Sequence, residues 1–222
     1  MSTSEPKTGG LLRAALDAGT ADPITWTDVL VGDLRVTVAS DAIKASAGGR
    51  DHVRLPVTYA EQVAIMATNG WISPTKAIAD AMYKQAKVRL VYVGLVMKPA
   101  DEDRMQTVDF SLRFDAGVAK QLDGKDFDEA DLVFGAWKLW ILNARIVEKG
   151  AVNYGFWDAK GNTIQTVGGQ HDAAHYDYSQ LLQPVKRWAT IDATDEAVDL
   201  AAYFAKQDKI PQSYLDPYGV AP

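Results

Sequence analysis

The stretch from Leu132 to Val147 is almost entirely apolar and carries Phe134, Trp137 and Trp140 among leucine, isoleucine and valine residues. It is shorter than the ~18 consecutive apolar residues that a membrane-spanning helix requires, so it predicts the core of a globular fold. Periodicity alone does not distinguish a buried strand from a buried helix in such a run. We expect strand structure, with Gly135 at a bulge, around which the other elements pack.

Short segments rich in β-branched and aromatic residues predict most of the other strands. The segments 26–31 and 34–38 are separated by Gly32-Asp33, which is typical of a hairpin, and their alternating pattern buries one face of the second strand. A second hairpin is expected around the loop 158–162. The remaining predicted strands are 52–57, 87–97, 152–157, 163–167 and a segment ending near Ile191.

Capping residues indicate where helices begin. Thr58 and Glu61 have the spacing of a capping box, and Ser73-Pro74 supplies an N-cap followed by a proline at the first helical position. Asn69-Gly70 ends the first of these helices, so the two are expected to form a helical hairpin. The predicted helices are 58–69, 74–85 and 195–206.

Strands and helices occur in separate runs rather than in regular alternation, which predicts an α+β fold. We expect a single domain with a mostly antiparallel sheet of about seven strands, a helix pair and a C-terminal helix. The predicted boundaries are an N-terminal arm at 1–23, the α+β domain at 24–206 and a C-terminal tail at 207–222.

Composition excludes several functional classes. The chain has no cysteine, which rules out disulfides, a thiol nucleophile and thiolate metal sites. Its 23 basic and 29 acidic residues give a formal charge of −6, which argues against nucleic acid or an anionic membrane as a partner. No signal-peptide pattern stands at the start, so we expect synthesis in the cytoplasm.

Acidic residues concentrate between Asp101 and Asp131, where ten acidic residues stand against four basic ones. The net charge of this stretch, −6, equals the net charge of the whole chain. Val108, Leu112 and Phe114 give this stretch a helical period before Gly117, and 121–131 is expected to be a loop. The stretch is interpreted as a solvated face. A calcium site at 123–129 is the alternative, although the ligand spacing of the usual calcium loop is absent.

Two of the three histidines lie close together after a glycine-rich loop. His171, His175 and Asp177 are the right residue types for a three-ligand zinc site with an open position for water. A second interpretation makes Ser179 a nucleophile, His175 its base and Asp177 or Asp172 the residue that orients the base. If 175–179 is a strand, His175, Asp177 and Ser179 share one face, which also fits a purely structural ladder of hydrogen bonds. We expect the ladder and no cofactor.

The same region resembles the end of a family of uncharacterised bacterial and phage-encoded proteins. The residues that carry the resemblance are Tyr154-Gly155-Phe156-Trp157, Asp158, Gly161, Ile164-Gln165, His171 and the block His175-Tyr176-Asp177-Tyr178-Ser179-Gln180, together with the segment Ser73-Pro74-Thr75-Lys76. Trp157 stands where the family has a histidine, and Gly135-Ala136-Trp137-Lys138 replaces a Gly-His-Lys-Lys segment. Polar groups of the family are therefore lost in this chain.

The resemblance implies a bacterial or phage-encoded protein that is synthesised in the bacterial cytoplasm and, if a phage encodes it, is located in the virion. We expect a non-catalytic structural or adaptor component of a virion, which contacts other virion proteins or copies of itself through its N- and C-terminal tails. The alternative is a hydrolase, for instance of peptidoglycan amides, that uses His175, Asp177 and Ser179 or a metal held by His171, His175 and Asp177.

Overall fold

The N-terminal hairpin forms as its residue pattern predicts. In this computed structural model, which describes residues 7–95, 104–146, 150–168 and 172–219, β1 (Trp26–Val31) pairs antiparallel with β2 (Leu34–Ala39). Val36 and Val38 of β2 are fully buried, whereas Arg35 and Thr37 alternate with them toward solvent. The period of two residues therefore separates a core face from an outer face.

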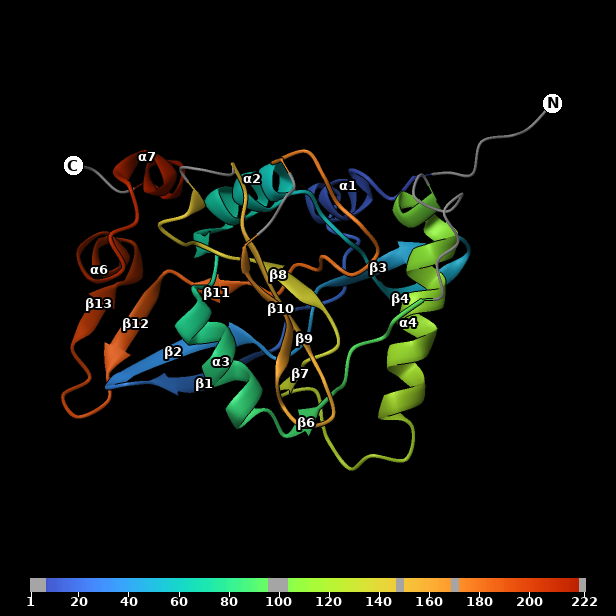
Figure 1. Cartoon of the computed structure of the whole chain (residues 1–222), viewed down its shortest axis with the longest axis horizontal. Coiled ribbons are helices and arrows are strands. Elements are labelled where there is room, and N and C mark those ends of the chain that lie inside the picture. Colours follow the sequence, from blue (N-terminus) through green and yellow to red (C-terminus); the bar gives the residue numbers. More distant parts are fainter. Residues whose placement is uncertain (1–6, 96–103, 147–149, 169–171, 220–222) are drawn as a thin grey trace.

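β2 lies at the centre of the largest sheet, which has six strands and is antiparallel throughout (Figure 1). β1 pairs with one side of β2, and two consecutive segments of the C-terminal part of the chain pair with its other side. These segments are β11 (Val185–Lys186) and β12 (Trp188–Ile191), which are flanked by β5 (Trp71–Ile72) and β13 (Ala197–Asp199) respectively.

Three smaller sheets complete the β structure. They are β3 (Lys44–Ala47) with β4 (Arg50–Arg54), β8 (Lys138–Trp140) with β9 (Asn153–Trp157) and β10 (Thr163–Gly168), and the parallel pair β6 (Val88–Arg89) and β7 (Val133–Phe134). The apolar run thus supplies two strands, and its two tryptophans are completely buried. The predicted mostly antiparallel α+β fold in one domain is confirmed.

Helices lie on several sides of these sheets. They are α1 (Leu11–Asp17), α2 (Tyr59–Asn69), α3 (Lys76–Gln85), α4 (Val108–Leu122), α6 (Leu200–Gln207), α7 (Gln212–Leu215) and the 3-10 helix η2 (Asp216–Tyr218). In Figure 1, α1, α2 and α7 line the top of the molecule, α4 stands at one end and α6 lies toward the other. The described parts of both chain ends pack onto the body, because Thr8, Leu12, Leu215 and Tyr218 are buried.

The capping box of Thr58 and Glu61 is present, but the predicted helical hairpin is wrong. β5 lies between the two helices, and α2 packs on β5 and η2 whereas α3 packs on β1. α3 begins at Lys76 after the N-cap Thr75, because the buried Ser73 hydroxyl bonds to the Tyr218 hydroxyl at 2.8 Å and does not cap a helix. The contact of Ser73 with the distant Tyr218 therefore moves the start of this helix from the predicted residue 74 to Lys76.

α4 continues past Gly117, where the sequence pattern had indicated its end. A Cβ at Gly117 would lie 2.5 Å from Cγ1 of Val93, so glycine is what allows the helix to approach the chain at 91–95. The long strand predicted at 87–97 shrinks to Val88–Arg89, and its residues 96–97 lie outside the described part. At Val91 the side-chain amide of Gln121 on α4 takes the position of a neighbouring strand. Its Oε1 accepts from the Val91 amide and its Nε2 donates to the Val91 carbonyl, both at 2.9 Å.

The last helix also starts later than predicted. Residues 197–199 form β13 against β12, and α6 begins at Leu200 with Asp199 as N-cap, whose carboxylate accepts from the Ala201 amide at 3.0 Å. Asp195, the expected first residue, has a positive φ of 55° in the turn that precedes β13. Val198 and the alanines that follow it have the spacing of one face of a helix, so the sequence pattern predicted helix where β13 forms.

Candidate functional site

The predicted histidine cluster is only partly within the described structure. His171 lies outside the described residues, so the three-ligand zinc arrangement is not placed. The segment 172–180 is a succession of turns rather than a strand, which removes the basis for a shared face of His175, Asp177 and Ser179. His175 is half-buried, and its backbone amide donates to the Asp172 carbonyl at 3.2 Å.

Asp177 instead faces a lysine from the apolar run. Nζ of Lys138 on β8 lies 2.6 Å from Oδ2 of Asp177, and both side chains are buried. Oδ1 of Asp177 accepts from the backbone amide and the hydroxyl of Ser179 at 2.8 and 2.5 Å. Burial alone would raise the pKa of Asp177, but the charge and hydrogen bond of Lys138, with the bonds from Ser179, lower it overall.

This geometry pairs the Ser179 hydroxyl with Asp177. Its side chain is 1% exposed, and its hydroxyl proton points to Asp177 instead of to an imidazole. A serine nucleophile needs a base that accepts its proton and a path for the substrate. Lys138 was missed from the sequence as a partner of Asp177, although a lysine inside an apolar run is itself a signal that a buried carboxylate must accompany it.

No group of three or more histidine, aspartate or glutamate side chains that could hold a metal occurs among the described residues. In the loop proposed for calcium, Asp128 caps its own turn, because Oδ1 accepts from the amides of Ala130 and Asp131 at 2.8 and 3.2 Å. A cap of this kind is the usual role of aspartate in a turn.

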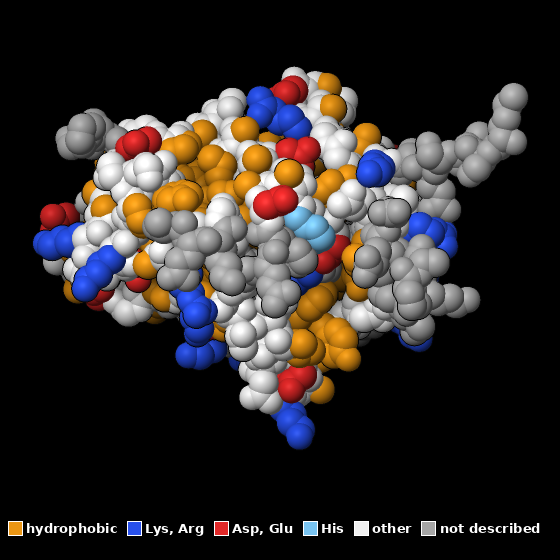
Figure 2. All heavy atoms as spheres, turned by 45° about the horizontal axis from the view of Figure 1, so that its top comes forward, with side chains coloured by type: hydrophobic (Ala, Val, Ile, Leu, Met, Phe, Trp, Pro, Cys, Tyr) orange, Lys and Arg blue, Asp and Glu red, His pale blue; other side chains and the backbone are white. Residues whose placement is uncertain are grey.

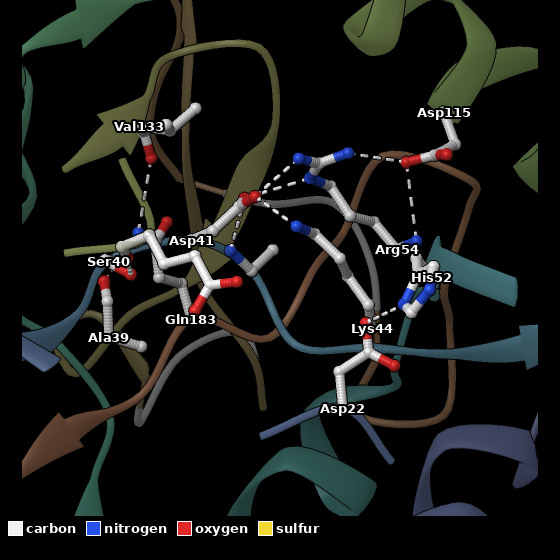
Figure 3. A network of polar contacts seen from close by, with 12 residues as sticks. Asp22, Ala39, Ser40, Asp41, Lys44, His52, Arg54, Asp115, Val133 and Gln183 are labelled. Atoms are coloured by element: carbon white, nitrogen blue, oxygen red, sulfur yellow. Dashed lines mark hydrogen bonds and ion pairs between the residues drawn. The ribbon is translucent and has the colours of Figure 1, made fainter. Parts of the chain in front are cut away.

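A second ionic network lies between β4, α4 and the chain after β2 (Figure 3). The buried guanidinium of Arg54 donates from Nε to Asp41 at 2.9 Å and from Nη1 to Asp115 at 2.7 Å. Nζ of Lys44 lies 2.9 Å from Asp41 as well. Two cations thus balance two carboxylates, which is how a buried arginine is tolerated.

The same network perturbs the pKa values of its members. Burial acts to raise the pKa of Asp41, but Arg54 and Lys44 outweigh it and the pKa is lowered. Burial acts to lower the pKa of Arg54, and its two carboxylate partners reverse the effect and raise it. At the exposed edge of the network, the hydrogen bond and charge of Asp22 raise the pKa of His52, whose Nδ1 is 2.8 Å from Oδ2.

A cleft of about 600 Å³ opens beside this network. Ile24, Ile43 and Phe127 give it an apolar lining, and the exposed residues Asp128 and Glu129 also line it. Such a cleft suits a ligand with an apolar body and a cationic group. The buried Ser40 hydroxyl in its lining donates to the Glu129 carbonyl at 2.6 Å and therefore fixes the acidic loop.

The outer face of the six-stranded sheet carries an unusual set of side chains. Cross-strand partners lie on the same face, so the register places Trp26, Trp71 and Trp188 together on the side opposite the buried valines. Trp188 is 59% exposed, and Trp26 and Trp71 are half-buried in an edge-to-face pair 5.6 Å apart. Half of the six tryptophans in the chain are thus not fully buried.

The top of the molecule differs from this sheet face. Figure 2 shows hydrophobic side chains in patches left of centre and below centre, with lysine, arginine, aspartate and glutamate side chains scattered around them. Among the described side chains visible there, charges of opposite sign are interspersed. The cleft and the outer sheet face are therefore the stronger candidates for binding.

Comparison of the chain with protein-family models, curated proteins and solved structures finds no match. Among the described residues, no helix combines the length and the apolar character needed to cross a membrane.

Proposed function

We propose that this protein is a non-catalytic structural or adaptor component of a larger assembly, and that the assembly is a phage particle. The observation that carries the proposal is the outer face of the six-stranded sheet, which exposes tryptophan to solvent. Monomeric proteins rarely display large aromatic side chains together, and tryptophan is enriched where proteins bind one another. The phage assignment rests on the resemblance in the C-terminal block.

The described contacts favour this face over the chain ends as the contact surface. Leu12 near the N-terminus and Leu215 and Tyr218 near the C-terminus are used within the chain. Trp188 and Leu30, in contrast, expose 59% and 47% of their surface on the sheet. A partner that covered them would bury apolar area at ~25 cal/mol per Å².

The test is to purify particles from the phage, or from an induced host, and to measure by mass spectrometry whether the protein co-purifies at fixed copy number. Particles are then prepared in hosts that supply either the wild-type protein or Trp188→Ser and no other copy of it. We expect constant stoichiometry for wild type and at least a tenfold loss of incorporation for Trp188→Ser. Absence of the protein from particles would contradict the proposal.

A peptidoglycan-release assay addresses the hydrolase alternative in the same preparation. Wild type is compared with His175→Ala, and we expect equal background release from both. Release by wild type that His175→Ala abolishes would replace the structural proposal with the enzymatic one.

A further inference from the structure

We propose that the outer face of the six-stranded sheet binds the same face of a second copy of this chain, forming a twofold-symmetric dimer. This inference rests on the proposed function and names the partner of its contact surface. The opposite face of the sheet is already covered, because Leu34, Val36 and Val38 lie in the core. Only the outer face is left for a partner.

Charge is distributed on this face in a self-complementary way. Asp28 on β1 pairs with Thr37 on β2, and the pairing of Val185 with Val38 places Lys186 beside Thr37 on the next strand. Asp28 and Lys186 therefore stand on opposite sides of β2, about 10 Å apart at ~4.8 Å per strand. Both are exposed, and within the described residues neither takes part in an ion pair.

A twofold axis along β2, in the plane between two facing sheets, exchanges the two sides of β2. It brings Asp28 of one protomer over Lys186 of its partner, and the reverse contact forms at the same time. Self-complementarity of this kind is what an isologous interface requires. Sheets that pack face to face do so with strands within about 30° of alignment, which this axis permits.

The apolar side chains obey the same symmetry. Leu30 pairs with Arg35 on β2, and Thr190 lies on the other side of Arg35, two residues after Trp188 on the same face. The axis therefore carries Leu30 onto the strip formed by Trp188 and Thr190 of the partner. Leu30 and Trp188 are two of the most exposed large hydrophobic side chains described, and this contact covers both.

Arg35 lies on the axis and faces its own copy. That juxtaposition is tolerated because the guanidinium already pairs with Asp192 and Asp195 in the turn before β13. Thr37, the other residue on the axis, is short, and its hydroxyl donates to Asp28 at 2.7 Å. The centre of the contact thus holds no uncompensated charge.

The test is the molar mass of the purified full chain, measured by sedimentation equilibrium over a wide concentration range. We expect a monomer–dimer equilibrium for wild type and a dissociation constant at least ~10-fold higher for Trp188→Ser. Ile164→Ser is the matched control, because Ile164 is 50% exposed on β10, outside this face, and should leave the equilibrium unchanged. A wild type that stays monomeric, or equal effects of the two substitutions, would overturn the proposal.

Charge reversal tests the register of the contact. Asp28→Lys and Lys186→Asp should each weaken the dimer, because each places two like charges opposite one another. The double variant exchanges the two charges and so restores both ion pairs, and its affinity should return to within about threefold of wild type. Failure of the double variant to recover would overturn this arrangement. A wild type that is monomeric yet needs Trp188 to enter particles would overturn the dimer and leave the proposed function standing, whereas a dimer absent from particles would do the opposite.

Discussion

The side-chain amide of Gln85 binds both backbone groups of Leu30. Oε1 accepts from the Leu30 amide at 3.0 Å, and Nε2 donates to the Leu30 carbonyl at 2.8 Å. Gln85 ends α3, and Leu30 lies on β1, the edge strand of the six-stranded sheet. The amide thus takes the place of one residue of a further strand and blocks growth of the sheet at this edge.

Replacement of Gln85 tests this block. Gln85→Met removes the donor and the acceptor, and each lost hydrogen bond should cost about 1 kcal/mol of local stability. We expect the Leu30 amide to exchange with solvent at least ~5-fold faster, as measured by hydrogen exchange with NMR detection. Lys84→Met, a change of the neighbouring exposed side chain, serves as control. Equal exchange rates in the two variants would contradict the assignment.

The buried ion pair of Lys138 and Asp177 should contribute strongly to folding. Lys138→Met leaves the carboxylate of Asp177 buried without its cation, and a broken buried pair costs about 3–5 kcal/mol. The free energy of unfolding, measured by urea titration, should fall by that amount. The double variant Lys138→Met/Asp177→Asn keeps an acceptor for Ser179 and should recover more than half of the loss. A single variant within about 1 kcal/mol of wild type would refute the role of this pair.

Acid should destabilise the protein through the same carboxylates. The pKa values of Asp177 and Asp41 are lower in the folded state than their ordinary values. The stabilisation from each is therefore complete above the ordinary pKa of about 3.9 and is lost as pH falls toward the folded-state value. We expect the free energy of unfolding to drop below about pH 4. Asp177→Asn should flatten this dependence, and an unchanged slope would count against it.

Gly135 should tolerate no side chain. Its φ is 127°, and a Cβ at this position would lie 2.2 Å from the carbonyl oxygen of Leu90. Gly135→Ala should cost more than about 2 kcal/mol, because it adds backbone strain and forces β7 away from residue 90. Gly124→Ala is the control, since its φ of 71° is also positive but nothing lies within 4 Å of the added carbon. Similar losses in thermal unfolding for both variants would indicate that conformational strain alone matters.

Elements that depend on neighbouring residues were predictable from the sequence. The hairpin of β1 and β2 and the capping box at Thr58 depend on groups only a few residues apart. The start of α6 was misplaced because the hydrophobic spacing after Asp195 fits a helix as well as a strand, and pairing with β12 decides between them. Periodicity contains no information about such a distant partner.

The partners of the polar site residues were even harder to predict, because they are far apart in the sequence. Asp177 was singled out with its neighbours in the sequence, yet its cation is Lys138, 39 residues away. Arg54 and Asp115 are 61 residues apart, and neither was considered a site residue. The three tryptophans of the outer sheet face could not be recognised as a group from the sequence, because only the register of five strands brings them to one face.

The position of β11 and β12 has a consequence for biosynthesis. These strands come from residues 185–191 and lie between β2 and the two flanking strands, so the largest sheet stays incomplete until these residues have been synthesised. A nascent chain on the ribosome therefore holds the β1–β2 hairpin with one side unpaired until then. Folding of this sheet is then expected to be slow, because β2 waits for pairing partners that are distant in the sequence, and the valines of β2 are accessible to chaperones in the interval.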